Sequence, residues 1–443
     1  MILLLFCSAC PPPISARTWY VKADATGDAP TIQAGIDSAA AGDTVLVAAG
    51  VYTDATERLV SGTPRLVNVH VSKNVVLTAE GSPENTVIDG MNGDIAVYAE
   101  GVDSTAAIIG FRIRTQTEGY ACIVLDEMRQ GQSQLVGVGI WCDATAVVIR
   151  GNTFSNNRTG VYLSESRATV HENTIFDCLT GISCNNQSDA SITGNSLSDC
   201  ASLIDVYDSS PTVSDNDLWS NRNIVCAGLS VVNSSAIISN NRISGMDVWA
   251  IHCAGGSPAI EDNLIDNCGY AVFLLGTMNA HVRRNLVVSD ATAVEVTYGT
   301  GAVVENNTIQ QAVVGVLLDQ TGSPVVAKNI IEKCTYGIEC YLPISPAITC
   351  NDVYDCDKSY SGQCPDRTGV GGNFSLDPEY CGIDGSGNYF LQRDSPCAPG
   401  NHPDGYDCGL IGAYEVNCGE VKASEKSWGA IKSLYRKAGE DRD

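Results

Sequence analysis

The segments Ile260-Glu261-Asp262-Asn263-Leu264-Ile265 and Val282-Arg283-Arg284-Asn285-Leu286-Val287 repeat one phrase. It consists of a branched apolar residue, two variable residues, an asparagine, one variable residue and a second apolar residue. Successive asparagines of the phrase are 21, 22, 21, 25 and then 22 residues apart, and no repeat is missing over residues 149–353. A fixed period of roughly 20–50 residues indicates a solenoid. The asparagines are Asn152, Asn173, Asn195, Asn216, Asn241, Asn263, Asn285, Asn307, Asn329 and Asn351.

The residue types of the repeat predict strands. Val, Ile, Thr and Asn dominate it, and long Ala, Leu, Glu and Lys stripes typical of helices are missing. A period of about 22 residues suits three short strands and three turns, which form one coil of a parallel β-helix. Coils stacked about 4.8 Å apart place each asparagine above the next. We expect the side-chain amides to bond in a ladder, at a sharp turn whose dihedral angles Asn tolerates.

Five further segments match the pattern of a known superfamily. They are residues 31–36, 42–47, 385–389, 395–397 and 411–414. Together with the repeats, they resemble the secreted bacterial right-handed parallel β-helix proteins of the pectin-lyase-like superfamily, over roughly residues 18–418. The resemblance implies an all-β, single-stranded, right-handed solenoid, for which the repeat count gives about 12–14 coils. It implies no single activity, because the superfamily hosts lyases, hydrolases, epimerases, esterases and binding proteins.

The chain is expected to divide into four parts. Residues 1–16 form a signal peptide, residues 17–62 an N-terminal cap and first coil, and residues 63–418 the β-helix. Residues 419–443 form a tail with a short helix. In the cap, residues 31–41 predict a helix that starts at the N-cap Thr31 and closes the first coil, because solenoids need caps.

Three stretches depart from the regular repeat. Phe111 takes the asparagine position in residues 107–113, and residues 114–143 predict an irregular coil with a loop. The Cys-rich end starts near residue 355, and residues 388–391 predict a last strand.

The N-terminal segment favours export. Residues 2–6 are apolar, prolines follow, and Ser15-Ala16 offers a cleavage point, although no Lys or Arg precedes the apolar run. Lipoprotein anchoring through Cys10 is the alternative. No other run reaches the roughly 20 apolar residues of a membrane span. We therefore expect a secreted, cell-surface or periplasmic monomer that is not an integral membrane protein.

The charge excludes several partners. The chain has 51 acidic and 26 basic residues and a net charge of −25, which argues against nucleic acid and anionic lipid. The same charge opposes polyanions such as pectate or alginate, unless cations intervene. The five histidines share no column, so no metal site is predicted. The acidic turn at residues 89–94 is expected to be a plain turn, with a calcium site as the alternative.

The 19 cysteines fit an oxidising compartment. Cys178, Cys200, Cys334 and Cys356 each follow an asparagine of the repeat by five residues, which indicates a buried column. Bridges Cys178–Cys200 and Cys334–Cys356 and free thiols are equally compatible with that stacking. The seven cysteines of residues 350–418, Cys356 among them, are irregularly spaced as a group and predict disulfide bonds.

A second strand follows each asparagine, and its outward residue lies about ten places on. In this superfamily such a row commonly lines the substrate groove. Here it reads Tyr162, Ser183, Asp205, Cys226, His252, Phe273, Glu295, Leu317 and Glu339. Rings stack on sugar faces and carboxylates bond hydroxyl groups, so the candidate binding residues are Tyr162, Asp205, His252, Phe273, Glu295 and Glu339.

The evidence for catalysis is weaker. Glu295 and Glu339 are two coils apart, about 10 Å, slightly beyond the range of about 6.5–9.5 Å for inverting glycosidases. The paired Asp and Gly-His-Gly of polygalacturonase-like members do not occur, and the row offers no Arg or Lys base of the pectate-lyase type. Alternating charges at Glu261, Arg283 and Glu305 predict a surface salt-bridge column instead. The sequence therefore favours a glycan-binding module over the alternatives, a polysaccharide lyase, hydrolase or epimerase and a structural spacer.

Overall fold

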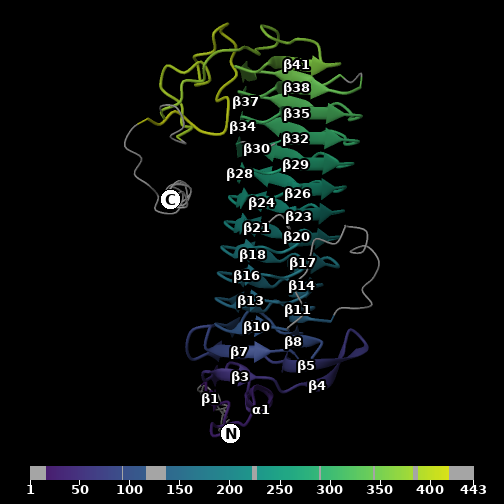
Figure 1. Ribbon diagram of the computed structural model, residues 1–443, viewed down its shortest axis with the longest axis vertical. Coiled ribbons are helices and arrows are strands. Elements are labelled where there is room, and N and C mark those ends of the chain that lie inside the picture. The colour runs from purple at the N-terminus through teal and green to yellow at the C-terminus, as the bar shows by residue number, and fades with distance from the viewer. Residues whose placement is uncertain are drawn as a thin grey trace, which may run out of the picture.

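The structure is a computed structural model that describes residues 16–91, 93–115, 136–221, 227–288, 291–342, 345–382 and 388–418. Its strands form three long sheets, which we call sheets A, B and C, and these wind into one parallel solenoid (Figure 1). Sheets A and C have 14 strands and sheet B has 13. The thirteen coils of residues 44–362 each contribute one strand to each sheet, and sheets A and C have one further strand apiece, so the expected count of about 12–14 coils is confirmed.

Sheet A consists of β1 (Thr18–Val21), β2 (Thr44–Val47), β6 (Val76–Ala79), β9 (Ala107–Ile109), β12 (Val148–Arg150), β15 (Thr169–His171), β18 (Ser191–Thr193), β21 (Thr212–Ser214), β24 (Ile237–Ser239), β27 (Ala259–Glu261), β30 (His281–Arg283), β33 (Val303–Glu305), β36 (Val325–Ala327) and β39 (Ala347–Thr349). Sheet B consists of β3 (Gly50–Tyr52), β7 (Thr86–Asp89), β10 (Arg112–Arg114), β13 (Thr153–Ser155), β16 (Thr174–Phe176), β19 (Ser196–Ser198), β22 (Asp217–Trp219), β25 (Arg242–Ser244), β28 (Leu264–Asp266), β31 (Leu286–Val288), β34 (Thr308–Gln310), β37 (Ile330–Glu332) and β40 (Asp352–Tyr354). Sheet C consists of β4 (Thr56–Val60), β5 (Thr63–Val71), β8 (Ile95–Glu100), β11 (Val138–Asp143), β14 (Thr159–Ser164), β17 (Thr180–Asn185), β20 (Ser202–Tyr207), β23 (Ala227–Val232), β26 (Trp249–Ala254), β29 (Tyr270–Leu275), β32 (Thr292–Thr297), β35 (Val314–Asp319), β38 (Tyr336–Cys340) and β41 (Lys358–Gly362).

The asparagine ladder is confirmed. Each of the ten asparagines donates from Nδ2 to Oδ1 of the next one over 2.9–3.1 Å. Phe111 heads the column, where its backbone N–H donates to Asn152 Oδ1. At the other end Asn351 donates to Asn373, an eleventh member that lies 22 residues further on. The apolar residues on both sides of each asparagine are buried in one core that runs along the solenoid.

The turn geometry corrects one expectation. The ladder asparagines are not themselves in the left-handed region; the residue before each of them is, for example Glu172, Asp262 and Arg284, with φ of 54–56°. The reason is that the Asn side chain supplies the hydrogen bonds at the corner. Asn263, for instance, donates to Ile238 O, the backbone carbonyl of the preceding coil.

Close stacking also explains the glycines that open several sheet C strands. A Cβ on Gly160 would lie 2.6 Å from the carbonyl oxygen of Gly181 in the next coil. Both residues take glycine because the backbone of the next coil occupies the space of a side chain there.

The N-terminal cap follows the prediction. Helix α1 (Ile32–Ser38) begins at the N-cap Thr31, whose Oγ1 accepts from the N–H of Ala34. Ile32 and Ile36 are buried in the end of the core. The antiparallel hairpin of β4 and β5 was not predicted. Its tip residue Ser61 donates a hydrogen bond to Asp143 on β11 (2.8 Å).

The loop predicted within residues 114–143 falls mainly on residues 116–135, which lie outside the described residues. The expected irregularity does not extend to its end. Strand β11 (Val138–Asp143) pairs in parallel with β8 and β14, because its apolar residues follow the same inward pattern as the neighbouring coils. Residues 1–15 of the predicted signal peptide, which include Cys10, also lie outside the described residues. The same holds for the tail of residues 419–443.

The chain beyond β41 returns along sheet B (yellow in Figure 1). Phe374, Leu391 and Ile411 pack against Ile330 of β37, and Gly412 N–H donates to Lys328 O (2.8 Å). We call the described part of residues 374–418 the C-terminal cap. The predicted strand at residues 388–391 is not formed; only isolated bridges join Leu391 to Tyr380 and Val416. The cap covers the outer face of sheet B at this end, so a site there must use another face.

Disulfide bonds hold the C-terminal region, as predicted. They are Cys340–Cys364, Cys350–Cys408 and Cys381–Cys418. Disulfide bonds are typical of extracellular and periplasmic proteins. No helix within the described ranges has the length and apolar character needed to cross a membrane.

The stacked cysteines Cys178, Cys200, Cys334 and Cys356 are free thiols, so the bridges Cys178–Cys200 and Cys334–Cys356 are not formed. Each thiol donates instead to the carbonyl two residues earlier, as Cys200 does to Ser198 O (3.4 Å). Asn157 fills the same position in its coil and donates to Ser155 O. Side chains stacked in parallel point the same way, whereas the two halves of a disulfide must converge.

Two smaller expectations concern charged side chains. The salt-bridge column forms in part, since Arg283 pairs with Glu261 (2.7 Å) and Arg284 with Asp262 (2.8 Å). In the acidic turn, the Asp89 carboxylate pairs with Arg114 (2.8 Å), and Asp94 accepts from Leu66 N–H. Protein groups therefore engage both carboxylates of the turn.

Candidate functional site

The outward residues of sheet C form one column that follows the solenoid axis. We call it the outer column: His70, Tyr98, Trp141, Tyr162, Ser183, Asp205, Ser230, His252, Phe273, Glu295, Leu317, Glu339 and Ser361. All six candidate binding residues lie in this column. Sequence spacing therefore located them on one face, although their surroundings differ along it.

One member of the predicted row is wrong. Ser230 pairs with Asp205 on one side and His252 on the other, and Cys226 lies outside the described residues. The coil between Asn216 and Asn241 is 25 residues long, and its extra residues precede β23 (Ala227–Val232). A count from Asn216 therefore stops too early.

The N-terminal third of the outer column is packed away. Tyr98, Trp141 and Tyr162 are buried in an outer apolar cluster with Val60 of the hairpin and Val67, Ile95 and Val138 of sheet C. The rings of Trp141 and Tyr162 meet edge to face at 4.8 Å. Tyr162 is 6% exposed, so we leave it outside the site proposed below.

Asp205 occupies the middle of the outer column and is 4% exposed. Its carboxylate accepts hydrogen bonds from Ser202 Oγ (2.5 Å) and Thr180 Oγ1 (3.3 Å). Burial raises the pKa of Asp205 to about 6, even though these two hydrogen bonds act in the opposite direction. The carboxyl group is thus buried, held by two hydroxyl donors, and has a pKa above the usual range of an aspartate.

Four rings cluster on the coils of β26 and β29, which follow the coil of Ser230. Trp249 and His252 lie 4.8 Å apart and His252 and Phe273 lie 5.4 Å apart, both nearly parallel, and Tyr270 contacts Phe273 at 5.8 Å. Trp249 and Tyr270 come from the start of β26 and β29, three residues before the outer column. Both are partly exposed, so this aromatic surface reaches solvent.

Carboxylates follow the rings. Glu295 is partly exposed and accepts from Thr297 Oγ1 (2.9 Å). Burial and, to a smaller extent, the nearby Asp319 raise the pKa of Glu295. Glu339 lies two coils further along, with the buried Leu317 between them.

Two more tyrosines border these acids. Tyr341 is 55% exposed, and partial burial together with Glu339, Glu295 and other neighbours raises its pKa. The ring of Tyr336 lies 5.5 Å from Lys358 Nζ. We call this part of sheet C the C-terminal platform, which consists of Trp249, Tyr270, Phe273, Glu295, Asp319, Tyr336, Glu339 and Tyr341.

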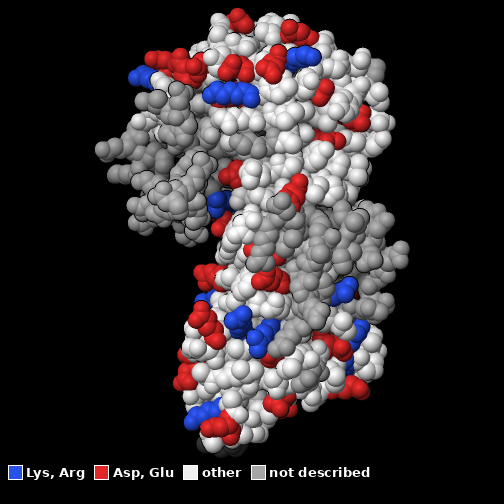
Figure 2. All heavy atoms as spheres, in the orientation of Figure 1, with Lys and Arg blue, Asp and Glu red and all other residues white. Residues whose placement is uncertain are grey.

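Charge on the solenoid surface is mixed rather than concentrated. On the face in Figure 2, acidic side chains are spread from end to end with basic ones between them. The C-terminal platform carries three carboxylates, and Lys358 is the cation that contacts it. Neither the face in Figure 2 nor the C-terminal platform has the excess of positive charge that would attract a polyanion.

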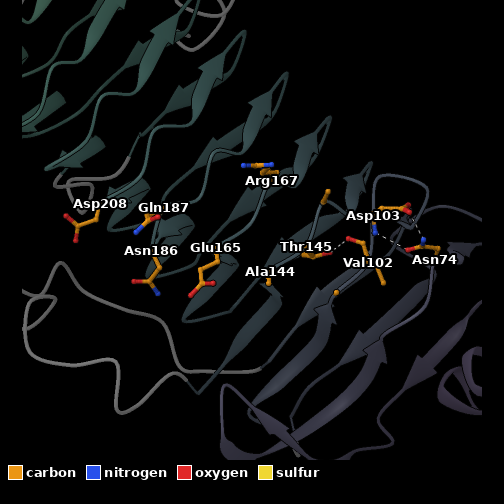
Figure 3. Close-up of a pocket in the computed structure, with 12 residues that line it drawn as sticks. Asn74, Val102, Asp103, Ala144, Thr145, Glu165, Arg167, Asn186, Gln187 and Asp208 are labelled. Atoms are coloured by element: carbon orange, nitrogen blue, oxygen red, sulfur yellow. Dashed lines mark hydrogen bonds between the residues drawn. The ribbon is translucent and has the colours of Figure 1, made fainter.

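A concave surface follows the edge where sheet C turns into sheet A. This edge groove has a volume of about 1250 Å³. Figure 3 shows Glu165, Asn186 and Asp208 in a row along it, with Arg167 set apart and Thr145 near the other end. Its polar lining comes from six consecutive coils, and the sequence analysis did not identify it.

Most of the site residues that the sequence analysis missed lie at a fixed number of positions from an outer-column residue. The platform residues Trp249, Tyr270 and Tyr336 precede their outer-column residues by three positions. The groove residues Glu165, Asn186 and Asp208 follow theirs by three. Both sets become visible once the column is known, since every coil repeats the same offsets.

The chain matches the family model of the right handed beta helix region at residues 84–243 and 249–370, which is more than half of its length. It therefore belongs to the right-handed β-helix family, and the predicted right-handed parallel β-helix is confirmed. No curated protein sequence matches the chain.

Solved structures with a similar fold include alginate lyases and a surface adhesin. An alginate lyase from Paenibacillus sp. str. FPU-7 is 15% identical, with a TM-score of 0.42, and the match covers 62% of this chain and 94% of that chain. A PL6 alginate lyase in complex with a trisaccharide is 10% identical, with a TM-score of 0.50 and coverage of 87% and 91%. PfbA, a surface adhesin of Streptococcus pneumoniae, is 13% identical, with a TM-score of 0.40 and coverage of 75% and 87%. At these identities the likeness concerns the fold alone.

Proposed function

We propose that the protein is an exported glycan-binding module whose site is the C-terminal platform. The observation that carries the proposal is the presence of partly exposed rings and carboxylates side by side on one face of sheet C. Rings such as Tyr270 and Tyr341 stack on sugar faces, and carboxylates such as Glu295 and Glu339 accept hydrogen bonds from hydroxyl groups. Binding at this face leaves the sheet B side to the C-terminal cap.

The charge of the platform favours uncharged sugars. Glu295, Asp319 and Glu339 would repel the carboxylates of a polyuronate, and Lys358 offsets one of these three charges. Among the described residues, no group of three His, Cys, Asp or Glu side chains converges to hold a metal ion, so cation-bridged uronate binding has no visible support. We therefore assign neutral polysaccharide as the ligand.

A glycan-processing enzyme is the second candidate. It is favoured by Asp205, whose pKa of about 6 suits a general acid. The arrangement of Glu295 and Glu339 argues against inversion, because the place between them, where a water would have to attack, is filled by Leu317. A structural spacer, the third candidate, would use neither surface.

The experiment that tests the proposal measures retention of the Glu295→Gln, Glu339→Gln double variant on immobilised neutral polysaccharides. We expect at least a tenfold weaker association than for the unaltered protein, which corresponds to about 1.4 kcal/mol. The matched control is Glu305→Gln, a partly exposed acid on sheet A in the adjacent coil. The assignment is wrong if the double variant and the control bind equally well.

A further inference from the structure

The edge groove lies outside the C-terminal platform and shares no residue with it. Glu165, Asn186 and Asp208 directly follow β14, β17 and β20. Each therefore leaves its coil at the same point, and Figure 3 shows them side by side. We infer that this groove is a second glycan-binding site, which holds an uncharged polysaccharide chain parallel to the solenoid axis.

The backbone of the groove is already engaged, so recognition must use side chains. Ala144 N–H donates to Ser164 O, Glu165 N–H to Asn185 O and Asp208 N–H to Val232 O, each in the next coil. No strand edge is left here for a peptide to extend. The side chains of Glu165, Asn186 and Asp208 are exposed and repeat about every 4.8 Å, which suits a polymer with regularly spaced hydroxyl groups.

The same turn position carries different residues in different coils. Glu165, Asn186 and Asp208 adopt φ of 49°, 55° and 48° there, in the left-handed region, whereas other coils place Gly101, Gly255 and Gly276 at this position. The coils of β14, β17 and β20 thus present polar side chains where those coils have none.

The row of turn positions that holds Glu165, Asn186 and Asp208 continues along the solenoid to an exposed ring. Tyr298 takes the same left-handed position (φ 54°) and is 57% exposed, and Gln320 of the next coil donates to its hydroxyl over 2.9 Å. Asn233, Gly255 and Gly276 occupy this position in the three coils between Asp208 and Tyr298, so the two coils next to Tyr298 carry no side chain there. A polysaccharide held by the groove can thus reach a stacking surface further along the same edge.

Size and charge define the ligand. A volume of about 1250 Å³ exceeds the roughly 300–1,000 Å³ of small-molecule pockets, which favours a polymer. The lining has the carboxylates of Asp103, Glu165 and Asp208 against the guanidinium of Arg167, which disfavours uronates. The inference rests on the glycan class of the proposed function but on none of its residues.

The test compares two double variants of the full chain. Glu165→Ala with Asp208→Ala removes two groove carboxylates. The control, Glu172→Ala with Asp215→Ala, removes two exposed acids at left-handed positions (φ 56° and 58°) of the turns between sheets A and B. Both variants lose the same charge and the same kind of turn residue, and thermal unfolding shows whether each remains folded.

Retention on soluble neutral polysaccharides in affinity electrophoresis is the readout, with the Glu295→Gln, Glu339→Gln variant run in parallel. We expect the groove variant to lose retention at least tenfold and the turn control to retain it. If only the platform variant loses retention, the groove inference is overturned and the proposed function stands. If only the groove variant loses retention, the groove inference stands and the platform assignment is overturned. If the unaltered protein shows no retention at all, both are rejected.

Discussion

Asn152 donates from its side-chain Nδ2 to the Oδ1 of Asn173 over 3.1 Å, although 21 positions separate the two residues in the chain. The same Asn173 oxygen accepts from the backbone N–H of Asn152. One side chain therefore joins two coils at the corner between sheets A and B, and nine others repeat the arrangement. The regular spacing of the asparagines in the sequence therefore corresponds to the stacking of successive coils.

Replacing Asn263 by Ala should lower the free energy of unfolding by about 1–3 kcal/mol. The change leaves Asn241 N–H without the Oδ1 acceptor and Ile238 O without the Nδ2 donor, in a buried place. Chemical denaturation measures the loss. Ser257→Ala, at an exposed position, is the control, and equal stability of the two variants would contradict the ladder.

Asp352→Asn should stabilise the protein at alkaline pH. Burial raises the pKa of Asp352 to about 8, and Glu332 and Asp377 act in the same direction. Because the folded state holds this proton more tightly than the unfolded chain, stability is lost as pH rises from about 4 to 8. Asn can still accept from Leu376 N–H but does not ionise.

We therefore expect Asp352→Asn to match the parent protein near pH 4 and to exceed it above pH 8. Each pKa unit corresponds to about 1.4 kcal/mol, so the gain should be at least ~1 kcal/mol in denaturation curves. Asp355→Asn, an exposed acid three residues on, should show no such trend. A pH-independent difference for Asp352→Asn would be inconsistent with its burial as a neutral acid.

Removing the Cys350–Cys408 disulfide with Cys350→Ala and Cys408→Ala should loosen the C-terminal cap. The bond joins the last regular coils to the segment that packs on β37, and loss of such a bond typically costs about 2–5 kcal/mol. Hydrogen exchange should speed up at residues 397–413 and stay slow in β20 and β23. Equal acceleration throughout the solenoid would show that the cap is not a separate stability unit; Cys178→Ala is the free-thiol control.

Tyr341→Ala should weaken retention on neutral polysaccharide about three- to tenfold without a change in melting temperature. The ring is 55% exposed beside Glu339 and Glu295, and a stacked ring contributes about 0.5–1.5 kcal/mol. Tyr406→Ala removes a ring of similar exposure from the C-terminal cap. If the two variants bind alike, Tyr341 is not part of the site.

The sequence predicts those features that repeat. Asn173, Glu295 and Glu339 could be placed because a solenoid converts a spacing of about 22 residues directly into stacking distance. Ser230 was missed because its coil has extra residues before the strand. The platform residue Tyr336 and the groove residue Glu165 were missed because they become visible only after the outer column is fixed.

Contacts without a period could not be predicted. The C-terminal cap packs on sheet B through pairs such as Asn306 and Leu410, which are 104 residues apart. The hairpin tip Ser61 meets Asp143 across 82 residues. Neither pair belongs to the repeat, so no periodic pattern in the sequence predicts these contacts.

The most direct test is to pass the protein over a panel of immobilised neutral and acidic polysaccharides and to follow both retention and the appearance of reducing ends or unsaturated products. We predict retention on at least one neutral polysaccharide, weaker retention on polyuronates, and no products. Accumulating products would contradict the binding module and point to catalysis along the outer column. Absence of retention on every polysaccharide would contradict glycan binding itself.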